Sequence, residues 1–366
     1  MLASDLAVPE GLSGRRLRSR ALLLAGLIVA VVAVIALLPG LGELRTLLSN
    51  ASPQWLLAGA VLKVLSGLGY VAVFRMVFCR RMTWRVSYQV GMSELGANAL
   101  FPTGGAGGLA LGAWALKRGG MPGEEIARRT VAFFLLTSVP NVVGVILIGL
   151  GLAAGVLAGV SNPLLTVVPA IAAALAIVAT LLAGRVATRW QLRLEQGGRH
   201  DGSRRARLAV KGLGALGDGV DEALALLREG NALVIGGLIA YLVFDVMILW
   251  ASFRALGVEP PLANVCLAYL LGELGGLIPV PGGIGGVDVG LVGALVLYGV
   301  SLAPATAAVL AYRVIALWVP AVLGALAFIA LRRTLRNEAD RIAVCAPQTE
   351  MDVIGIGRVV IESPAR

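Results

Sequence analysis

The sequence predicts an all-α, polytopic membrane protein with inverted-topology repeats and two re-entrant helical hairpins. The first observation is composition: 58% of the 366 residues are hydrophobic and only 14% are charged, which leaves too little polar surface for a soluble protein of this size. The second is self-similarity, because two apolar segments interrupted by Pro and Gly recur far apart in the chain. The third is the gathering of Lys and Arg in short segments between apolar runs.

Apolar stretches that cross the hydrocarbon core of a bilayer need about 20 residues. Six segments meet this requirement, and we expect each to form a full span. They lie at about 21–38, 55–78, 130–154, 163–184, 231–256 and 305–331. The first follows a cluster of arginines but lacks an obvious small-residue cleavage site, so it is predicted to be a retained span rather than a secretory signal.

Two further apolar regions, 86–117 and 264–299, are interrupted in the middle by Pro and Gly. Each half is roughly 15 residues long, which is short for a full span, so we interpret each region as a re-entrant hairpin. Two pairs of short full spans remain the alternative, because they would return the chain to the same side. Free peptide groups at such a break are tolerated in a membrane only where they are buried in protein or line a wet cavity.

The distribution of basic residues sets the expected orientation. Loops on one side of the predicted bundle hold most of the Lys and Arg, so the net charge of +10 indicates cytoplasmic loops rather than nucleic-acid binding. Both termini are expected in the cytoplasm of a bacterial cell. A basic cytoplasmic N-terminus is predicted at 1–20 and a cytoplasmic tail at 334–366. The transmembrane domain between them (21–333) contains repeat one at about 86–184, a cytoplasmic loop at 185–230 and repeat two at about 264–331. The basic loop is interpreted as a solvated connector, with attraction of anionic lipid headgroups as the alternative.

The internal repeat has a nearly constant offset. Residues 94–108 read ELGANALFPTGGAGG and residues 273–286 read ELGGLIPVPGGIGG, with the Glu-Leu-Gly triplets 179 residues apart. Further on, VAFFLLTSVPNVVG from Val131 matches AYRVIALWVPAVLG from Ala311 at an offset of 180. Three predicted spans separate the copies, so the second copy is inverted. Inverted repeats with broken helices are typical of transporters whose substrate site lies near the bilayer midplane.

Six ionisable side chains fall in the apolar regions. They are Lys63, Glu94, Asp245, Glu273, Asp288 and Arg313. Each costs about 2.5–3.5 kcal/mol at the bilayer centre, so they should face the protein interior or water. Glu94 and Glu273 are equivalent in the two repeats, and Lys63 and Arg313 are their expected counter-charges. The cluster is interpreted as binding a polar headgroup or taking up protons during transport; a buried ion-pair network that fixes helix register is the alternative.

The two broken segments and the later AYRVIALWVP segment, which holds Tyr312, Arg313 and Pro320, resemble the lysylphosphatidylglycerol synthase transmembrane-domain family, also called flippase-like domain proteins. The resemblance covers about 22–333. It implies movement of a phospholipid, aminoacylated in the best-understood members, between the two leaflets. The separate cytosolic domain that makes that lipid is not expected in this sequence, so the resemblance implies translocation without aminoacyl transfer.

We therefore expect a lipid flippase or scramblase of the bacterial cytoplasmic membrane, acting on a phospholipid or a polyprenyl-linked lipid. A small-solute or ion-coupled transporter is the alternative. A lipid-phosphate phosphatase is disfavoured because both Gly-rich loops lack Ser and Arg and because the one histidine, His200, lies in a polar loop. The residues expected to bind or transport substrate are Lys63, Glu94, Asn98, Pro102, Gly104, Gly105, Glu273, Pro279, Pro281, Gly282, Gly283, Asp288, Tyr312 and Arg313.

No enzymatic activity, cofactor or metal site is expected, since the three cysteines lack the close spacing of a zinc site. The expected partners are membrane lipids. A homo-oligomer and a separately encoded lipid-modifying enzyme are further candidate partners, and nucleic acid is not expected.

Overall fold

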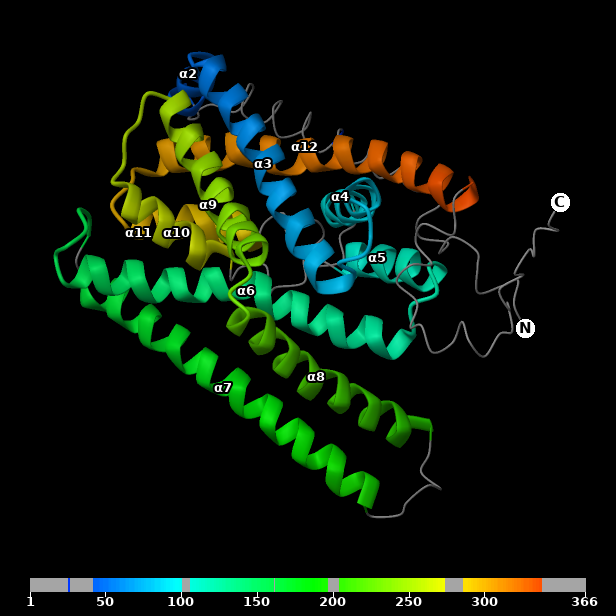
Figure 1. Ribbon diagram of the computed structural model, residues 1–366. Helices are drawn as coiled ribbons and strands as arrows, with labels where there is room; N and C mark the ends of the chain where they lie inside the picture. The colour runs from blue at the N-terminus through cyan, green and yellow to red at the C-terminus, as the bar shows by residue number, and fades with distance from the viewer. Residues whose placement is uncertain are drawn as a thin grey trace.

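A computed structural model describes residue 26 and residues 42–100, 106–160, 162–196, 204–273 and 286–337. Every regular element within these residues is helical, as the sequence predicts (Figure 1). The helices are α2 (Gly42–Ser49), α3 (Pro53–Phe78), α4 (Trp84–Leu100), α5 (Ala106–Arg118), α6 (Gly123–Ala153), α7 (Pro163–Gln196), α8 (Arg204–Arg228), α9 (Ala232–Ala255), α10 (Leu262–Gly272), α11 (Gly286–Leu297) and α12 (Leu302–Asn337).

Five of the described helices are long and apolar enough to cross a membrane, which confirms a multi-pass membrane protein. They are α3, α6, α7, α9 and α12, and they coincide with five of the six predicted spans. The other predicted span, 21–38, lies almost entirely outside the described residues. Helix α2 was not predicted, because the sequence places it in a short loop between two spans.

Each region predicted to be a broken hairpin contains two short helices, α4 with α5 and α10 with α11. In the first pair, Gly108 lies against Asn98 and Gly112 lies against Glu94, so the two helices run antiparallel. The residues expected at the two breaks lie outside the described part of the chain. They are Pro102, Gly104, Gly105, Pro279, Pro281, Gly282 and Gly283. The re-entrant geometry of both pairs stays a prediction.

Two close helix contacts organise the bundle. A Cβ atom added to Gly69 of α3 would lie 2.7 Å from the carbonyl oxygen of Gly237 on α9, and one added to Gly96 of α4 would lie 2.7 Å from Cα of Gly324 on α12. Because the obstructing atoms belong to the backbone, any larger residue at these positions would push the helices apart. Small residues of this kind let transmembrane helices approach closely.

The packing of the two halves is reciprocal. Helix α4, from the first broken region, packs against α12, while α10, from the second, packs against α6. Helix α3 packs against α9 between them. This arrangement is what two related halves would produce, and the inverted repeat itself stays a prediction.

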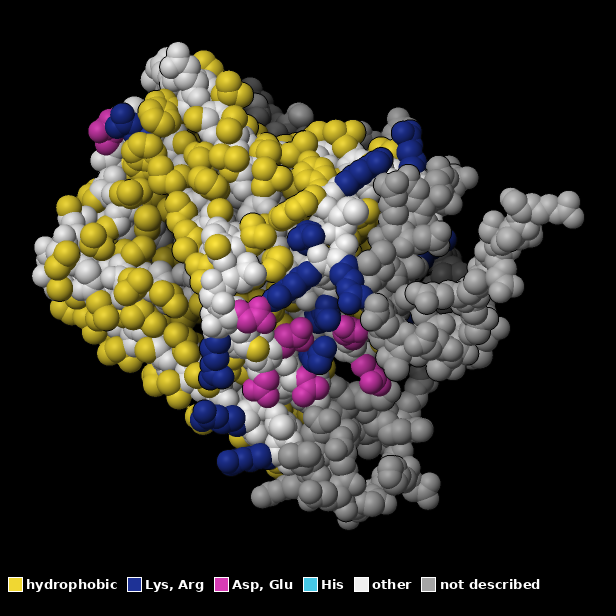
Figure 2. Space-filling view, viewed as in Figure 1, with side chains coloured by type: hydrophobic (Ala, Val, Ile, Leu, Met, Phe, Trp, Pro, Cys, Tyr) yellow, Lys and Arg dark blue, Asp and Glu magenta, His cyan; other side chains and the backbone are white. Residues whose placement is uncertain are grey.

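The segment predicted as the loop 185–230 is largely helical, which corrects that expectation. Helix α7 continues to Gln196, and α8 forms a second helix that packs against α6 and α7 (Figure 1). Ion pairs fasten α8, including one between Arg128 and Glu222 at 3.0 Å and one between Arg80 and Glu229. Figure 2 shows basic and acidic side chains gathered over this part of the molecule, whereas hydrophobic side chains cover much of the rest of this face. The connector is thus a helix that is attached to the bundle by ion pairs and by buried apolar residues, including Ala223 and Leu226.

Candidate functional site

A polar cavity of about 280 Å³ lies among the helices of the bundle. Residues from α3, α4, α6, α9 and α12 line it, together with the end of α10. The lining residues are Lys63, Leu95, Asn98, Ala99, Asn141, Tyr241, Leu242, Asp245, Tyr269, Glu273, Tyr312, Arg313, Ala316 and Pro320. Five of the residues predicted to bind substrate, from four separate segments of the sequence, therefore share one cavity.

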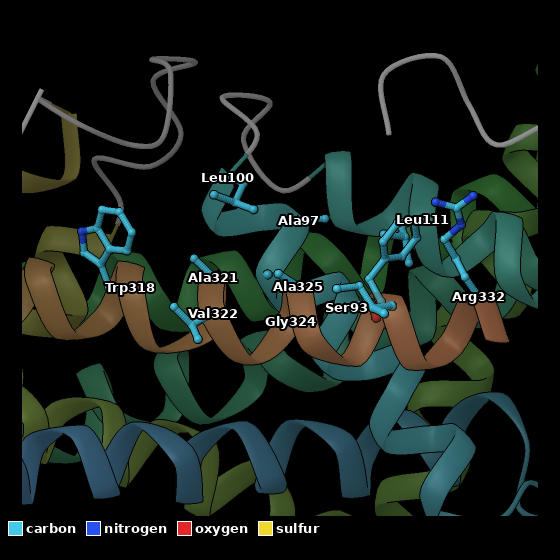
Figure 3. Close-up of a pocket in the computed structure, with 13 residues that line it drawn as sticks. Ser93, Ala97, Leu100, Leu111, Trp318, Ala321, Val322, Gly324, Ala325 and Arg332 are labelled. Atoms are coloured by element: carbon cyan, nitrogen blue, oxygen red, sulfur yellow. The ribbon is translucent and has the colours of Figure 1, made fainter. Parts of the chain in front are cut away.

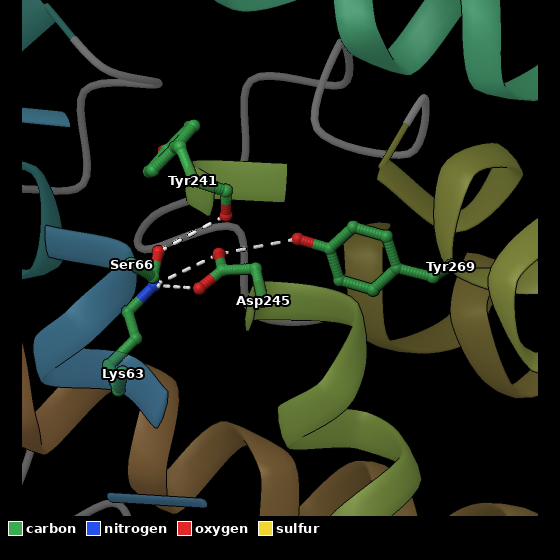
Figure 4. Close-up of polar contacts among 5 residues, drawn as sticks. All are labelled: Lys63, Ser66, Tyr241, Asp245 and Tyr269. Atoms are coloured by element: carbon green, nitrogen blue, oxygen red, sulfur yellow. Dashed lines mark hydrogen bonds and ion pairs between the residues drawn. The ribbon is translucent and has the colours of Figure 1, made fainter. Parts of the chain in front are cut away.

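A buried ion pair between Lys63 and Asp245 forms one wall of the cavity (Figure 4). The Lys63 ammonium donates to both carboxylate oxygens of Asp245, at 2.7 and 2.9 Å, and the Tyr269 hydroxyl donates to the same carboxylate at 3.3 Å. Nearby, the Ser66 hydroxyl donates to the backbone carbonyl of Tyr241 at 3.2 Å. These contacts hold α3, α9 and α10 in register. The direct ion pair of Lys63 is therefore with Asp245, and not with one of the glutamates.

Arg313, on α12, lines the cavity and forms an ion pair with Asp288. Asp288 lies in the first turn of α11, where the helix dipole favours a carboxylate. This pair joins α11 to α12. Arg313, the second expected counter-charge, therefore also forms its ion pair with an aspartate rather than with Glu94 or Glu273, because Asp288 lies on the neighbouring helix α11.

Glu273 is the carboxylate most open to the cavity. It caps the C-terminal end of α10, and its side chain is solvent-accessible although it lies among the cavity residues. Within the described part of the chain it makes neither a hydrogen bond nor an ion pair, in contrast to Asp245. A polar group entering the cavity would meet this carboxylate without first displacing a protein partner.

Glu94, the repeat equivalent of Glu273, lies outside the cavity lining. Its side chain is buried, with 2% of its surface exposed, and it accepts a hydrogen bond of 3.0 Å from the Tyr70 hydroxyl. The missing side chain of Gly112 makes room for it, because a Cβ there would lie 2.6 Å from Oε1 of Glu94. Glu94 is thus packed between α3, α4 and α5, while Glu273 lines the cavity.

Asn98 connects the cavity to the start of α5. Its side-chain oxygen accepts a hydrogen bond of 2.8 Å from the backbone N–H of Gly108, in the first turn of that helix. N–H groups in the first turn of a helix have no acceptor within the helix, and the Asn98 side chain supplies one for Gly108.

Tyr241, Asp245 and Tyr269 line the cavity but were not among the residues expected to bind substrate, and a pattern in the sequence could have located them. Tyr241 and Asp245 are four residues apart on α9, and Tyr269 and Glu273 have the same spacing at the end of α10. Residues four apart lie on one face of a helix. Polar side chains at that spacing within apolar helices would have located the lining, including the role of Asp245, which the sequence reasoning ranked below the glutamates.

The arrangement is suited to binding a charged or polar group. It offers an open carboxylate, three tyrosine side chains and two basic side chains that are ion-paired with aspartates on other helices. Among the described residues, no group of three or more His, Cys, Asp or Glu side chains could hold a metal ion. Hydrogen bonding and ion pairing are therefore the chemistry that these side chains supply.

Residues 23–324 match the family described as "Lysylphosphatidylglycerol synthase TM region". The chain is also similar to a UPF0104 membrane protein of Methanothermobacter thermautotrophicus, with 27% identity over 327 residues that cover 82% of this chain and 93% of that protein. The family match includes every residue that lines the polar cavity.

Proposed function

Because the chain belongs to the lysylphosphatidylglycerol synthase transmembrane family, we propose that it is a lipid flippase or scramblase. The transported molecule is a membrane lipid with a polar headgroup. The headgroup passes through the polar cavity while the acyl chains stay in the surrounding bilayer. The chain supplies binding groups and performs no bond-breaking step.

The observation that carries this proposal is the charged cavity within a bundle of apolar helices. Taking a bare polar or charged group into hydrocarbon costs several kcal/mol or more, which makes spontaneous headgroup crossing slow. A cavity that presents hydrogen-bonding and charged side chains lowers this cost. Maintaining six ionisable groups among apolar helices is itself unfavourable, so a purely structural bundle would gain stability by replacing them with apolar residues.

Glu273 and the two ion pairs bind different groups of the lipid headgroup. Glu273 receives hydrogen-bond donors or positive charge on the headgroup, since it has no hydrogen bond or ion pair in the described structure. Lys63 and Arg313 face the same space and can share their charge with a headgroup phosphate while remaining close to their aspartates. Both signs of charge are thus available within one cavity, as a zwitterionic or anionic headgroup requires.

The proposal places the protein in the bacterial cytoplasmic membrane with both termini in the cytoplasm. The distribution of Lys and Arg in the sequence supports this orientation. A lipid-modifying enzyme encoded separately would supply or consume the transported lipid.

The direct test is lipid movement in reconstituted vesicles. Fluorescent phosphatidylglycerol and phosphatidylethanolamine are placed in both leaflets, and dithionite bleaches only the outer-leaflet label. We expect vesicles with the wild-type protein to lose nearly all fluorescence, whereas protein-free vesicles keep the inner-leaflet half. Ala316→Trp fills the cavity and should restore the protected half. Val314→Trp, on the same helix but 48% exposed and outside the cavity lining, should bleach like wild type.

Protection equal to that of protein-free vesicles for both headgroups would contradict the proposal. The cavity would then serve the alternative function, transport of a small solute or ion, which the same vesicles can report as solute uptake or a change in internal pH. Equal bleaching with Ala316→Trp and with wild type would show that lipid crosses by another route.

A further inference from the structure

A second cavity, an apolar groove, lies on the other side of the contact between α4 and α12. It has a volume of about 360 Å³ and is lined by side chains from α4, α5 and α12 (Figure 3). Leu95, Asn98 and Ala99 of α4 face the polar cavity, whereas Gly96, Ala97 and Leu100 face this apolar groove. The same pair of helices therefore separates two binding environments of opposite character.

The groove opens toward the surface of the bundle. Val322 and Ile329, which line it, have 52% and 51% of their surface exposed. The close approach of Gly96 and Gly324 removes side-chain bulk between the two helices. The groove is consequently a depression along an apolar face of α12, where a membrane protein meets lipid.

One end of the groove carries a positive charge. Arg332 lines it at that end, and Trp318 lies toward the other, with small residues of α12 between them (Figure 3). The guanidinium of Arg332 makes no hydrogen bond or ion pair within the described part of the chain. Arg332 is also exposed and lies near the end of α12 that the sequence predicts to be cytoplasmic.

The length of the groove matches one leaflet of a bilayer. Trp318 and Arg332 are fourteen positions apart on α12, which corresponds to about 21 Å of helix. Half of a ~30 Å hydrocarbon core, with part of the headgroup region added, has a similar depth. A groove that is apolar along a leaflet and cationic at the surface complements a lipid with an acyl chain below a negative headgroup.

We propose that this groove binds an anionic phospholipid of the cytoplasmic leaflet, with an acyl chain along α12 and the headgroup phosphate at Arg332. This site is distinct from the polar cavity and does not depend on transport. The bound lipid covers the junction of α4 and α12 and thereby seals the polar cavity from the membrane on this side.

The test uses Trp318 as the reporter, because bromine on an acyl chain quenches tryptophan fluorescence on contact. The full-length protein is reconstituted in phosphatidylcholine vesicles containing increasing fractions of dibrominated phosphatidylglycerol or dibrominated phosphatidylcholine. Subtracting the signal of Trp318→Phe isolates the contribution of Trp318. One favourable charge contact near the surface is worth about 1 kcal/mol, so we expect half-quenching at an about fivefold lower fraction of the anionic lipid.

Matched variants identify the groups responsible. Arg332→Gln should remove the preference for the anionic lipid, while Arg333→Gln, which changes the adjacent exposed arginine outside the groove, should keep it. Ala325→Phe fills the groove from an exposed position and should reduce quenching of Trp318 by both lipids. Equal half-quenching by the two lipids would overturn the proposal, since it indicates only unselective boundary lipid. Absence of Trp318 quenching would also overturn it and would indicate that protein covers the groove.

Discussion

The two broken-helix regions carry the same Glu-Leu-Gly triplet but place its glutamate in different surroundings. In α4, Glu94 is enclosed between helices and hydrogen-bonded to Tyr70. At the end of α10, Glu273 opens into the polar cavity and has no hydrogen bond or ion pair in the described structure. Sequence equivalence therefore does not make the two carboxylates functionally equivalent. We assign packing to the first and substrate contact to the second.

The physical cause of this difference lies in the neighbouring helices. Gly112 of α5 leaves space for the Glu94 carboxylate, and Tyr70 of α3 supplies a hydrogen-bond donor. Around Glu273, the basic side chains that could have paired with it are bound to Asp245 and Asp288 instead. Glu273 is thus left open to the cavity because aspartates form the ion pairs with the nearby Lys63 and Arg313.

Breaking the ion pair at the cavity should have the largest effect on stability. Lys63→Met leaves the buried Asp245 carboxylate without its cation, so we expect a loss of about 3–5 kcal/mol in the free energy of unfolding. The loss would be measured by thermal or denaturant unfolding in detergent. The double variant Lys63→Met with Asp245→Asn removes the unpaired charge and should recover most of the stability. A single variant as stable as wild type would show that the pair does not hold α3 to α9.

Filling the space beside Glu94 should have the next largest effect. In Gly112→Val the new side chain collides with the carboxylate, and overpacking of this kind costs about 1–3 kcal/mol. The matched control is Gly293→Val in α11 of the second broken region, where an added Cβ meets nothing within 4 Å. Equal losses of stability for the two variants would mean that Gly112 is not required for packing of Glu94.

Removing the hydrogen bond to Glu94 should have an effect no larger than that of Gly112→Val. Tyr70→Phe deletes the hydrogen bond that the Tyr70 hydroxyl donates to this buried carboxyl, and leaving such a group unsatisfied costs about 1–3 kcal/mol. Tyr269→Phe is the comparison in the second region. In Tyr269→Phe, Asp245 keeps its hydrogen bonds from Lys63, so the loss in the free energy of unfolding should be nearer 1 kcal/mol. The order of the two melting temperatures checks this expectation.

Much of the architecture could be predicted from the sequence, because hydrophobic length depends on local composition. The positions of α3, α6, α7, α9 and α12 follow from this signal. The pairs of short helices in the regions 86–117 and 264–299 follow instead from the Pro and Gly residues at the centre of each region. The helical nature of the segment after α7 was missed because the segment is too polar to be recognised as a membrane span. Helix α8 is held by an ion pair with α6 and by a few buried apolar residues, including Ala223 and Leu226.

The pairing of charges could not be predicted in the same way. Lys63 and Asp245 are 182 residues apart, and their contact depends on how closely α3 and α9 cross. That crossing is set by Gly69 and Gly237, whose role emerges only when the two helices are placed together. The sequence identified the ionisable residues, but it could not show that Lys63 and Arg313 form their ion pairs with Asp245 and Asp288.

The most direct test of the account compares the same substitution at the two equivalent glutamates. Glu273→Gln and Glu94→Gln would be reconstituted in vesicles, and the rate of fluorescent-lipid movement would be measured by dithionite bleaching. We expect Glu273→Gln to slow lipid movement at least about tenfold, which corresponds to an activation free energy higher by roughly 1.4 kcal/mol. The melting temperature of this variant should be unchanged. Glu94→Gln should transport at close to the wild-type rate because an amide can still accept from Tyr70. Full transport by Glu273→Gln, or loss of transport only in Glu94→Gln, would contradict the assignment.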